Sequence, residues 1–217
     1  TVNGVGYDDF AKALDAAETD DTVTLLKDVT IDSTIEMSGI TLTAEPGVTV
    51  TAITTSNTYT FKLSNGATLD DLTVELGDLE DSGAVNVVLM NDGTTVKNCK
   101  FTGHYVLDRV NEQGESNPDG EVSRAIEGSS GTLTITGNTF ENLRQPAYIN
   151  ACTGKISNNH VSGTRGWVIC GNSNMEITGN TFGTNAVDIA IIDDNTGDPT
   201  NTNNYAEKIT ELSKFNG

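Results

Sequence analysis

The sequence has 217 residues, of which 35% are hydrophobic and 6% aromatic, and it carries 31 Asp and Glu against 12 Lys and Arg. A formal net charge of −19 would repel phosphate backbones and anionic lipid headgroups, which argues against nucleic-acid or membrane-surface binding through bulk charge. No stretch approaches the roughly 18 to 20 consecutive apolar residues of a transmembrane helix, so we expect no membrane insertion.

Small polar residues dominate the composition, with 32 Thr, 22 Asn and 22 Gly. A compact globule with so few large apolar side chains would struggle to offset its conformational entropy. A narrow core closed by backbone hydrogen-bond ladders would not have this difficulty. We therefore expect one elongated domain over residues 1–217.

The N-terminal segment combines a short helix with strands. Apolar residues at positions 7, 10, 11, 14 and 17 predict an amphipathic helix over residues 7–17. Alternating patterns at 23–31, 40–43 and 48–53 predict strands. Residues 1–22 are expected to form a helical cap over the first strands, which would otherwise present unpaired edges.

A six-residue template recurs through the rest of the chain. ITGNTF at 135–140 returns as ISNNHV at 156–161 and as ITGNTF at 177–182, in steps of 21 residues. LDDLTV at 69–74 and VKNCKF at 96–101 fit the same template, 27 residues apart. The longer step from 96 to 135 contains a polar stretch that is expected to protrude as a loop over residues 111–120.

Each template is preceded by a second short apolar strand and a turn rich in Gly, Asn, Ser or Thr. Short strands at a regular period without helices predict an all-β fold, a right-handed parallel β-helix of about 21 residues per coil over residues 23–198. Like residues of successive coils should then stack, with Asn138, Asn159 and Asn180 in one ladder and Phe101 and Phe140 inward in another. Residues 199–217 are expected to form a short C-terminal cap.

The opening 30 residues followed by strand pairs and ITGNTF units resemble the right-handed parallel β-helix domains of the pectate-lyase-like superfamily, and in particular those of large surface proteins of Gram-positive bacteria. The resemblance covers the whole chain. It implies a fold and an extracellular or cell-surface location, and it implies little about activity because that superfamily contains lyases, hydrolases and non-catalytic adhesins.

The outward strand faces beside the 111–120 loop are the expected ligand surface. Tyr148, Asn150, Arg165 and Trp167 lie one or two coils beyond that loop. An outward aromatic ring beside charged groups suits a sugar, because the ring stacks on the apolar face while the hydroxyl groups form hydrogen bonds. For Trp167 the alternative of a core or coil-corner position stays open.

An enzyme is the competing hypothesis. A polysaccharide lyase or glycoside hydrolase would draw on Asp108, Arg124, Glu127 and Asp188, and a hydrolase would need two carboxyl groups roughly 5 to 9.5 Å apart. The superfamily's signature blocks are missing, because no WIDH-like run, GHG or RIK occurs and only the pairs at 70–71 and 193–194 resemble the hydrolase DD. The resemblance therefore transfers no catalytic residue.

Metal and cysteine chemistry have weak signals. No cofactor is expected, and the two histidines, His104 and His160, are not at ligand spacing. Calcium stays open because oxygen ligands alternate at 193–198, although the Glu that closes an EF-hand loop is absent. Three cysteines without a CxxC pair favour buried thiols, and a Cys152–Cys170 disulfide stays open.

These observations favour a non-catalytic extracellular module on a bacterial cell surface. Its expected partner is a glycan or a host or microbial surface protein, and it would act as a monomeric part of a larger surface protein. The alternatives are the polysaccharide-cleaving enzyme and a structural stalk spacer.

Overall fold

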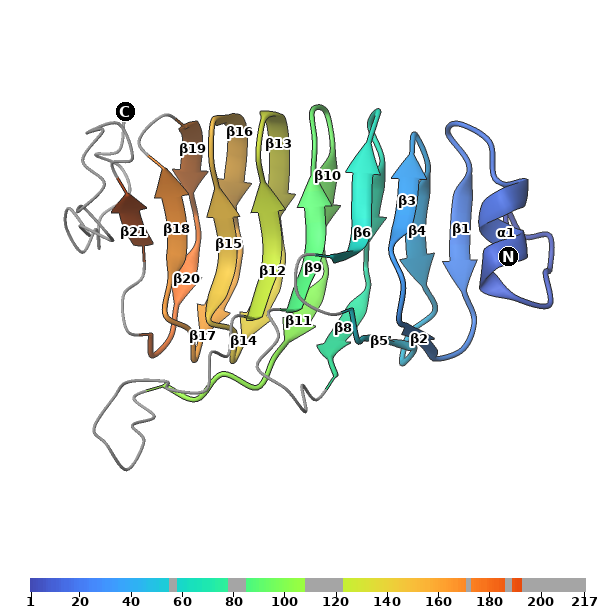
Figure 1. The fold of residues 1–217 in the computed structure, drawn as a ribbon, viewed down its shortest axis with the longest axis horizontal. Coiled ribbons are helices and arrows are strands. Elements are labelled where there is room, and N and C mark those ends of the chain that lie inside the picture. The colour runs from blue at the N-terminus through green and yellow to red at the C-terminus, as the bar shows by residue number, and fades with distance from the viewer. Residues whose placement is uncertain (55–57, 78–84, 108–122, 171–172, 186–188, 193–217) are drawn as a thin grey trace.

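The computed structural model describes residues 1–54, 58–77, 85–107, 123–170, 173–185 and 189–192 and shows a parallel β-solenoid (Figure 1). Three sheets of seven parallel strands run side by side along its axis, and each coil contributes one strand to each sheet. The predicted all-β parallel solenoid is confirmed. Within the described ranges, no helix is long and apolar enough to cross a membrane.

Consecutive strands pass from the first sheet to the second and then to the third. Sheet A contains β1 (Thr22–Leu25), β4 (Thr41–Ala44), β7 (Thr68–Asp70), β10 (Thr95–Lys97), β13 (Gly131–Thr136), β16 (Cys152–Ser157) and β19 (Asn174–Thr178). Sheet B contains β2 (Val29–Ile31), β5 (Thr49–Ala52), β8 (Thr73–Leu76), β11 (Lys100–Thr102), β14 (Thr139–Glu141), β17 (His160–Ser162) and β20 (Thr181–Phe182). Sheet C contains β3 (Ile35–Ser38), β6 (Tyr59–Ser64), β9 (Val85–Met90), β12 (Ser123–Gly128), β15 (Gln145–Ile149), β18 (Trp167–Cys170) and β21 (Ile189–Ile192).

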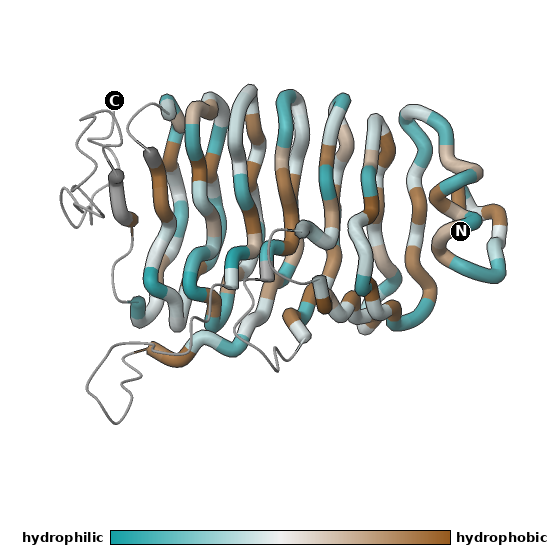
Figure 2. The backbone as a smooth tube through the Cα atoms, in the orientation of Figure 1, coloured by the Kyte–Doolittle hydropathy of each residue, from teal (hydrophilic) through white to brown (hydrophobic). Residues whose placement is uncertain are grey.

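The register of the strands follows the sequence template. Ile135 pairs with Val96 on one side and with Ile156 on the other, and Phe140 likewise pairs with Phe101 and Val161. The step of 21 residues holds in the last coils, whereas the earlier coils are longer or shorter because their turns differ. In strands such as β4 and β5 every second residue is buried, and hydrophobic and hydrophilic residues are interleaved along the backbone (Figure 2). Few apolar residues per coil therefore suffice to fill the narrow core.

The third template position forms the corner between sheets A and B. Asp71, Asn98 and Asn158 adopt φ of 55°, 55° and 56°, and Gly137 and Gly179 adopt 66° to 69° at the same position. This left-handed conformation is accessible to Gly and, with modest cost, to Asn and Asp. The corner thus explains why the template carries only Asp, Asn or Gly there.

The fourth template position forms the predicted asparagine ladder. The Asn138 Nδ2 donates to Asn159 Oδ1 at 3.0 Å, and the Asn159 Nδ2 donates to Asn180 Oδ1 at 2.9 Å. The same side chains bond the backbone, since Asn138 Nδ2 also donates to the Val96 carbonyl and Asn159 Oδ1 accepts from the Asn138 N–H. Asn138 and Asn159 are buried, so these bonds satisfy groups that water does not reach.

The first coil is covered by the N-terminal cap. Helix α1 (Phe10–Ala16) begins three residues later than predicted, because the Asp9 carboxylate accepts a hydrogen bond from the Lys12 N–H and caps the helix at that point. Residues 1–5 add a contribution that the sequence did not predict. Val2 pairs antiparallel with Val23, which covers the outer edge of β1. The predicted loop at 111–120 and cap at 199–217 lie outside the described residues.

Candidate functional site

The outward face of sheet C departs from strict strand alternation. Tyr59, Asn86, Arg124 and Gln145 are register partners in four adjacent coils, and pairing resumes two residues later at Phe61, Val88, Ile126 and Ala147. The residue between these positions and the residue after it are both buried in each strand. The alternation of inward and outward residues is therefore broken in each strand, where two consecutive residues point inward. The outward residues before this break form one row across the four coils, and the outward residues after it form a second row.

The lower row contains Tyr59, Asn86, Arg124 and Gln145, and the upper row contains Lys62, Leu89, Glu127 and Tyr148. Pro146 lies at the break in β15, where its missing N–H is tolerated because no ladder pairing is made there. Spacing of three residues within a strand thus brings pairs such as Arg124 and Glu127 to the same face.

Arg124 is the centre of a polar cluster on this face. Its Nε donates to Gln145 Oε1 at 3.0 Å, its Nη1 bonds and pairs with Glu127 Oε2, and its guanidinium lies 4.6 Å from the centre of the Tyr148 ring. The side chains of Arg124 and Glu127 are only 18% and 22% exposed. Partial burial strengthens such contacts relative to an exposed ion pair, and the three contacts fix the guanidinium.

Tyr59 extends the cluster to the coil two steps before that of Arg124. Burial, together with the charge of Glu127 and a hydrogen bond to it, raises the pKa of Tyr59 to about 12, and Arg124 partly offsets this. The phenol is therefore neutral at physiological pH and donates a hydrogen bond to the carboxylate. The cluster of Tyr59, Arg124, Glu127 and Tyr148 holds one positive and one negative charge and is neutral as a whole.

Asn86 lies between Tyr59 and Arg124 in the lower row and is 9% exposed. Its Oδ1 is buried and has no hydrogen-bond partner. Among the described residues, the only other buried side-chain polar atom without a hydrogen-bond partner is Trp167 Nε1.

Trp167 is placed in the core, which corrects the expectation of an outward ring that stacks on a ligand. Its side chain is 1% exposed, and its ring meets Phe140 edge-on with centroids 5.2 Å apart. Phe140 in turn stacks on Phe101 at 5.4 Å. The inward direction follows from the register, because Tyr148 pairs with Val168 and the preceding position therefore points inward.

The other predicted residues are distributed along sheet C. Arg124, Glu127 and Tyr148 come together in the cluster. Arg165 lies at the start of the β18 coil, where its N–H donates to the Arg144 carbonyl at 3.1 Å, two coils from Arg124. Asn150 lies in the turn after β15, where its N–H donates to the Gly128 carbonyl at 2.8 Å.

Of the three carboxylates of the enzyme hypothesis, Glu127 alone lies within the described residues. Asp108 and Asp188 lie outside the described residues, as does the 193–198 segment considered for calcium. Glu127 is held by Arg124 and Tyr59. No group of three or more His, Cys, Asp or Glu side chains within the described ranges could hold a metal ion.

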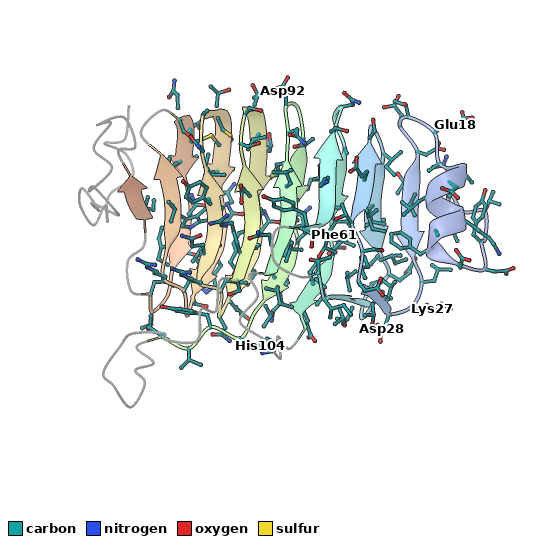
Figure 3. All side chains as sticks on the ribbon, viewed as in Figure 1. Glu18, Lys27, Asp28, Phe61, Asp92 and His104 are labelled. Atoms are coloured by element: carbon teal, nitrogen blue, oxygen red, sulfur yellow. The ribbon has the colours of Figure 1, made fainter. Side chains whose placement is uncertain are left out.

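The histidines and cysteines take part in local structure. His104 (Figure 3) bonds the Leu76 carbonyl through Nε2 at 2.6 Å. His160 is exposed in β17, and its Nδ1 bonds Thr181 Oγ1 at 2.9 Å. Cys99 and Cys152 are buried, and the Cys152 thiol donates to the Asn150 carbonyl at 3.0 Å. Burial raises the pKa of Cys99 to about 12, so it is a neutral thiol and not a nucleophile at physiological pH.

A cavity of about 430 Å³ lies at the N-terminal end of the solenoid, bounded by α1, β1 and the corner before β2. Its lining combines apolar residues such as Phe10 and Leu25 with charged residues, among them Asp9, Lys27 and Asp28.

Sequence reasoning missed Tyr59, Asn86 and Gln145. The signal that could have found them is the three-residue spacing of outward residues, since Tyr59 and Lys62, or Gln145 and Tyr148, repeat the spacing of Arg124 and Glu127. An expectation of strict two-residue alternation hides this spacing.

Comparisons with known proteins add no relative to this picture: no protein-family description, no curated protein and no solved structure matches the chain.

Proposed function

We propose that this protein is a non-enzymatic module that binds a glycan on the outward face of sheet C. The observation that carries the proposal is the cluster in which Arg124 is fixed between Glu127, Gln145 and the ring of Tyr148. Sugar-binding sites combine an aromatic or apolar surface with a few oriented polar groups.

The cluster is ordered before any ligand arrives. Arg and Glu side chains lose considerable rotamer entropy when they are immobilised on binding, and this cost is smaller when the side chains are already held. The lower row from Tyr59 to Gln145 spans four coils, which are three steps of roughly 4.8 Å, about 14 Å in all. This length supports a ligand of more than one sugar unit.

A cell-surface location in a bacterium, as one module of a larger protein, is part of the same proposal. It is supported by the resemblance of the repeats to β-helix domains of surface proteins and by the net charge of −19. A protein ligand is less well supported than a glycan, because the cluster is small and polar and lacks a broad apolar centre.

The proposal is tested with the purified chain on a glycan array, followed by calorimetry with the glycans retained. Tyr148→Ala and Arg124→Ala should each weaken binding at least tenfold, because they remove the ring and the fixed guanidinium. Lys100→Ala is the matched control, since Lys100 forms an ion pair with Glu141 at 2.9 Å on sheet B. It should leave binding unchanged.

Absence of any array signal from the folded chain would contradict the proposal and favour a stalk spacer. Turnover of a polysaccharide, lost in Glu127→Gln, would instead favour the enzyme hypothesis.

A further inference from the structure

We infer that Asn86 is the specificity-determining anchor of the sheet C cluster and that it selects an uncharged, hydroxyl-bearing saccharide. This inference rests on the proposed glycan-binding function. Nothing in the sequence pattern singled out Asn86, and the inference comes from the state of its side chain in the folded chain.

The first step is the contrast between Asn86 and the other buried asparagines. Asn138 and Asn159 are 1% exposed and use both Oδ1 and Nδ2 in hydrogen bonds. Asn86 is 9% exposed, yet its buried Oδ1 has no partner. A buried polar atom without a partner costs folding free energy, so such an atom in an otherwise satisfied fold calls for a reason.

The second step is the position of Asn86. Its register partners are Tyr59 on one side and Arg124 on the other, and both point to the outward face where they contact Glu127. The unpaired Oδ1 therefore sits within the cluster, between its aromatic and its cationic members. Because Oδ1 is shielded from solvent, a ligand hydroxyl would reach it by entering between the side chains of Tyr59 and Arg124.

The third step is the chemistry that such an amide accepts. Oδ1 is an acceptor and needs an O–H or N–H donor from the ligand. If the amide oxygen and nitrogen were interchanged, the buried position would instead need an acceptor. A sugar hydroxyl serves in both cases because it is a donor and an acceptor, whereas a carboxylate is only an acceptor.

The fourth step is charge. Arg124 is already compensated by Glu127, and Lys62 on the same face pairs with Glu36 at 3.3 Å. An anionic sugar would find no uncompensated cation in this cluster and would face the Glu127 carboxylate. Electrostatics therefore favours an uncharged saccharide.

The experiment compares the full chain with its Asn86→Leu variant, which keeps the number and branching of the side-chain heavy atoms but replaces the amide oxygen and nitrogen with two larger methyl groups. The probes are neutral oligosaccharides of two to six units, namely gluco-, manno- and galacto-oligosaccharides, and oligogalacturonates of equal length. Calorimetry should show binding of at least one neutral series. Asn86→Leu should weaken that binding at least tenfold and should lower the melting temperature less than Asn159→Leu does, because both variants add the same volume but only Asn159 loses hydrogen bonds.

Asn159→Leu provides the contrast, because it removes a fully bonded buried amide and should lower the melting temperature. Asn86→Ala, which removes the amide without adding volume, repeats the binding test if Asn86→Leu does not fold. Binding only to oligogalacturonates would overturn the inference and leave the proposed function standing. Unchanged neutral-sugar affinity in whichever of these two Asn86 variants folds would also overturn it. No binding to either class would count against the proposed function itself.

Discussion

The asparagine ladder shows how single residues stabilise a fold with a small apolar core. Asn159 Oδ1 accepts from both the N–H and the Nδ2 of Asn138, and its own Nδ2 donates to the Ile135 carbonyl and to Asn180. The side chain therefore satisfies buried groups in three successive coils, and its removal would leave several of them without partners.

We predict that Asn159→Ala lowers the free energy of unfolding by about 3 kcal/mol, because each buried group left unpaired costs roughly 1 to 3 kcal/mol. Urea unfolding followed by circular dichroism measures the change. Asn174→Ala, at an exposed position in β19, should stay within about 0.5 kcal/mol of the parent chain. Equal losses in the two variants would show that the ladder contributes little.

The sequence predicted the place of residues that recur at the same position in successive coils, and it did not predict the place of residues that occur at such a position only once. The ladder and the Phe101–Phe140 stack were predicted because identical residues recur in register. Trp167 occurs once, so the sequence could not decide between core and surface. Asn86 escaped notice because its partners come from other coils and its unpaired state depends on three-dimensional contacts.

At the scale of elements, close contact between coils depends on particular glycines. Gly154 lies within β16 at φ 119°, and a Cβ added there would lie 2.1 Å from the Leu133 carbonyl oxygen of the neighbouring coil. Gly66 has a similar left-handed conformation at φ 80° but no atom within 4 Å of the added Cβ. Substituting both glycines therefore distinguishes the stability cost of backbone strain, which both positions share, from the cost of a collision between coils, which only Gly154 would show.

We predict that Gly66→Ala costs about 1 kcal/mol of stability through backbone strain, and that Gly154→Ala costs at least about 2 kcal/mol more because β13 and β16 must move apart. Thermal and urea unfolding measure both variants. Equal effects of the two substitutions would mean that the neighbouring strand accommodates the methyl group without cost.

Elements were predicted well where the template was strong. All coils from 69 onwards that the structure describes fall in the predicted register, and the predicted segment 23–31 resolves into β1 and β2 with a corner between them. The break in alternation on sheet C was not predicted. It is set by how four adjacent strands pack together, and a single strand read alone does not contain that information.

At the scale of the whole molecule, acidic groups outnumber basic groups by 31 to 12. Labelled examples such as Glu18, Asp28 and Asp92 lie at the turns along both sides of the solenoid (Figure 3). Exposed ion pairs such as Lys97–Asp70, at 3.1 Å, stabilise by only about 0 to 1 kcal/mol each. Repulsion among the excess carboxylates is therefore the larger electrostatic effect.

We predict that raising NaCl from about 20 mM to 300 mM at pH 7 increases the melting temperature by a few degrees, since shorter Debye lengths screen this repulsion. Scanning calorimetry measures the shift. The increase should shrink near pH 4.1, the isoelectric point of the sequence, where net charge vanishes. A melting temperature that falls with salt at pH 7 would indicate that ion pairs outweigh repulsion.

The break on sheet C has a consequence for how such a molecule can change over evolutionary time. It falls at the same register position in four coils, marked by Thr60, Val87, Ala125 and Pro146, so it forms a continuous crease along the sheet. Duplication of one complete coil would lengthen the crease by one strand and would add one residue to each outward row, without altering the geometry of either. The length of ligand that the surface accommodates can thus change through coil number, while the residues that contact each sugar unit stay the same.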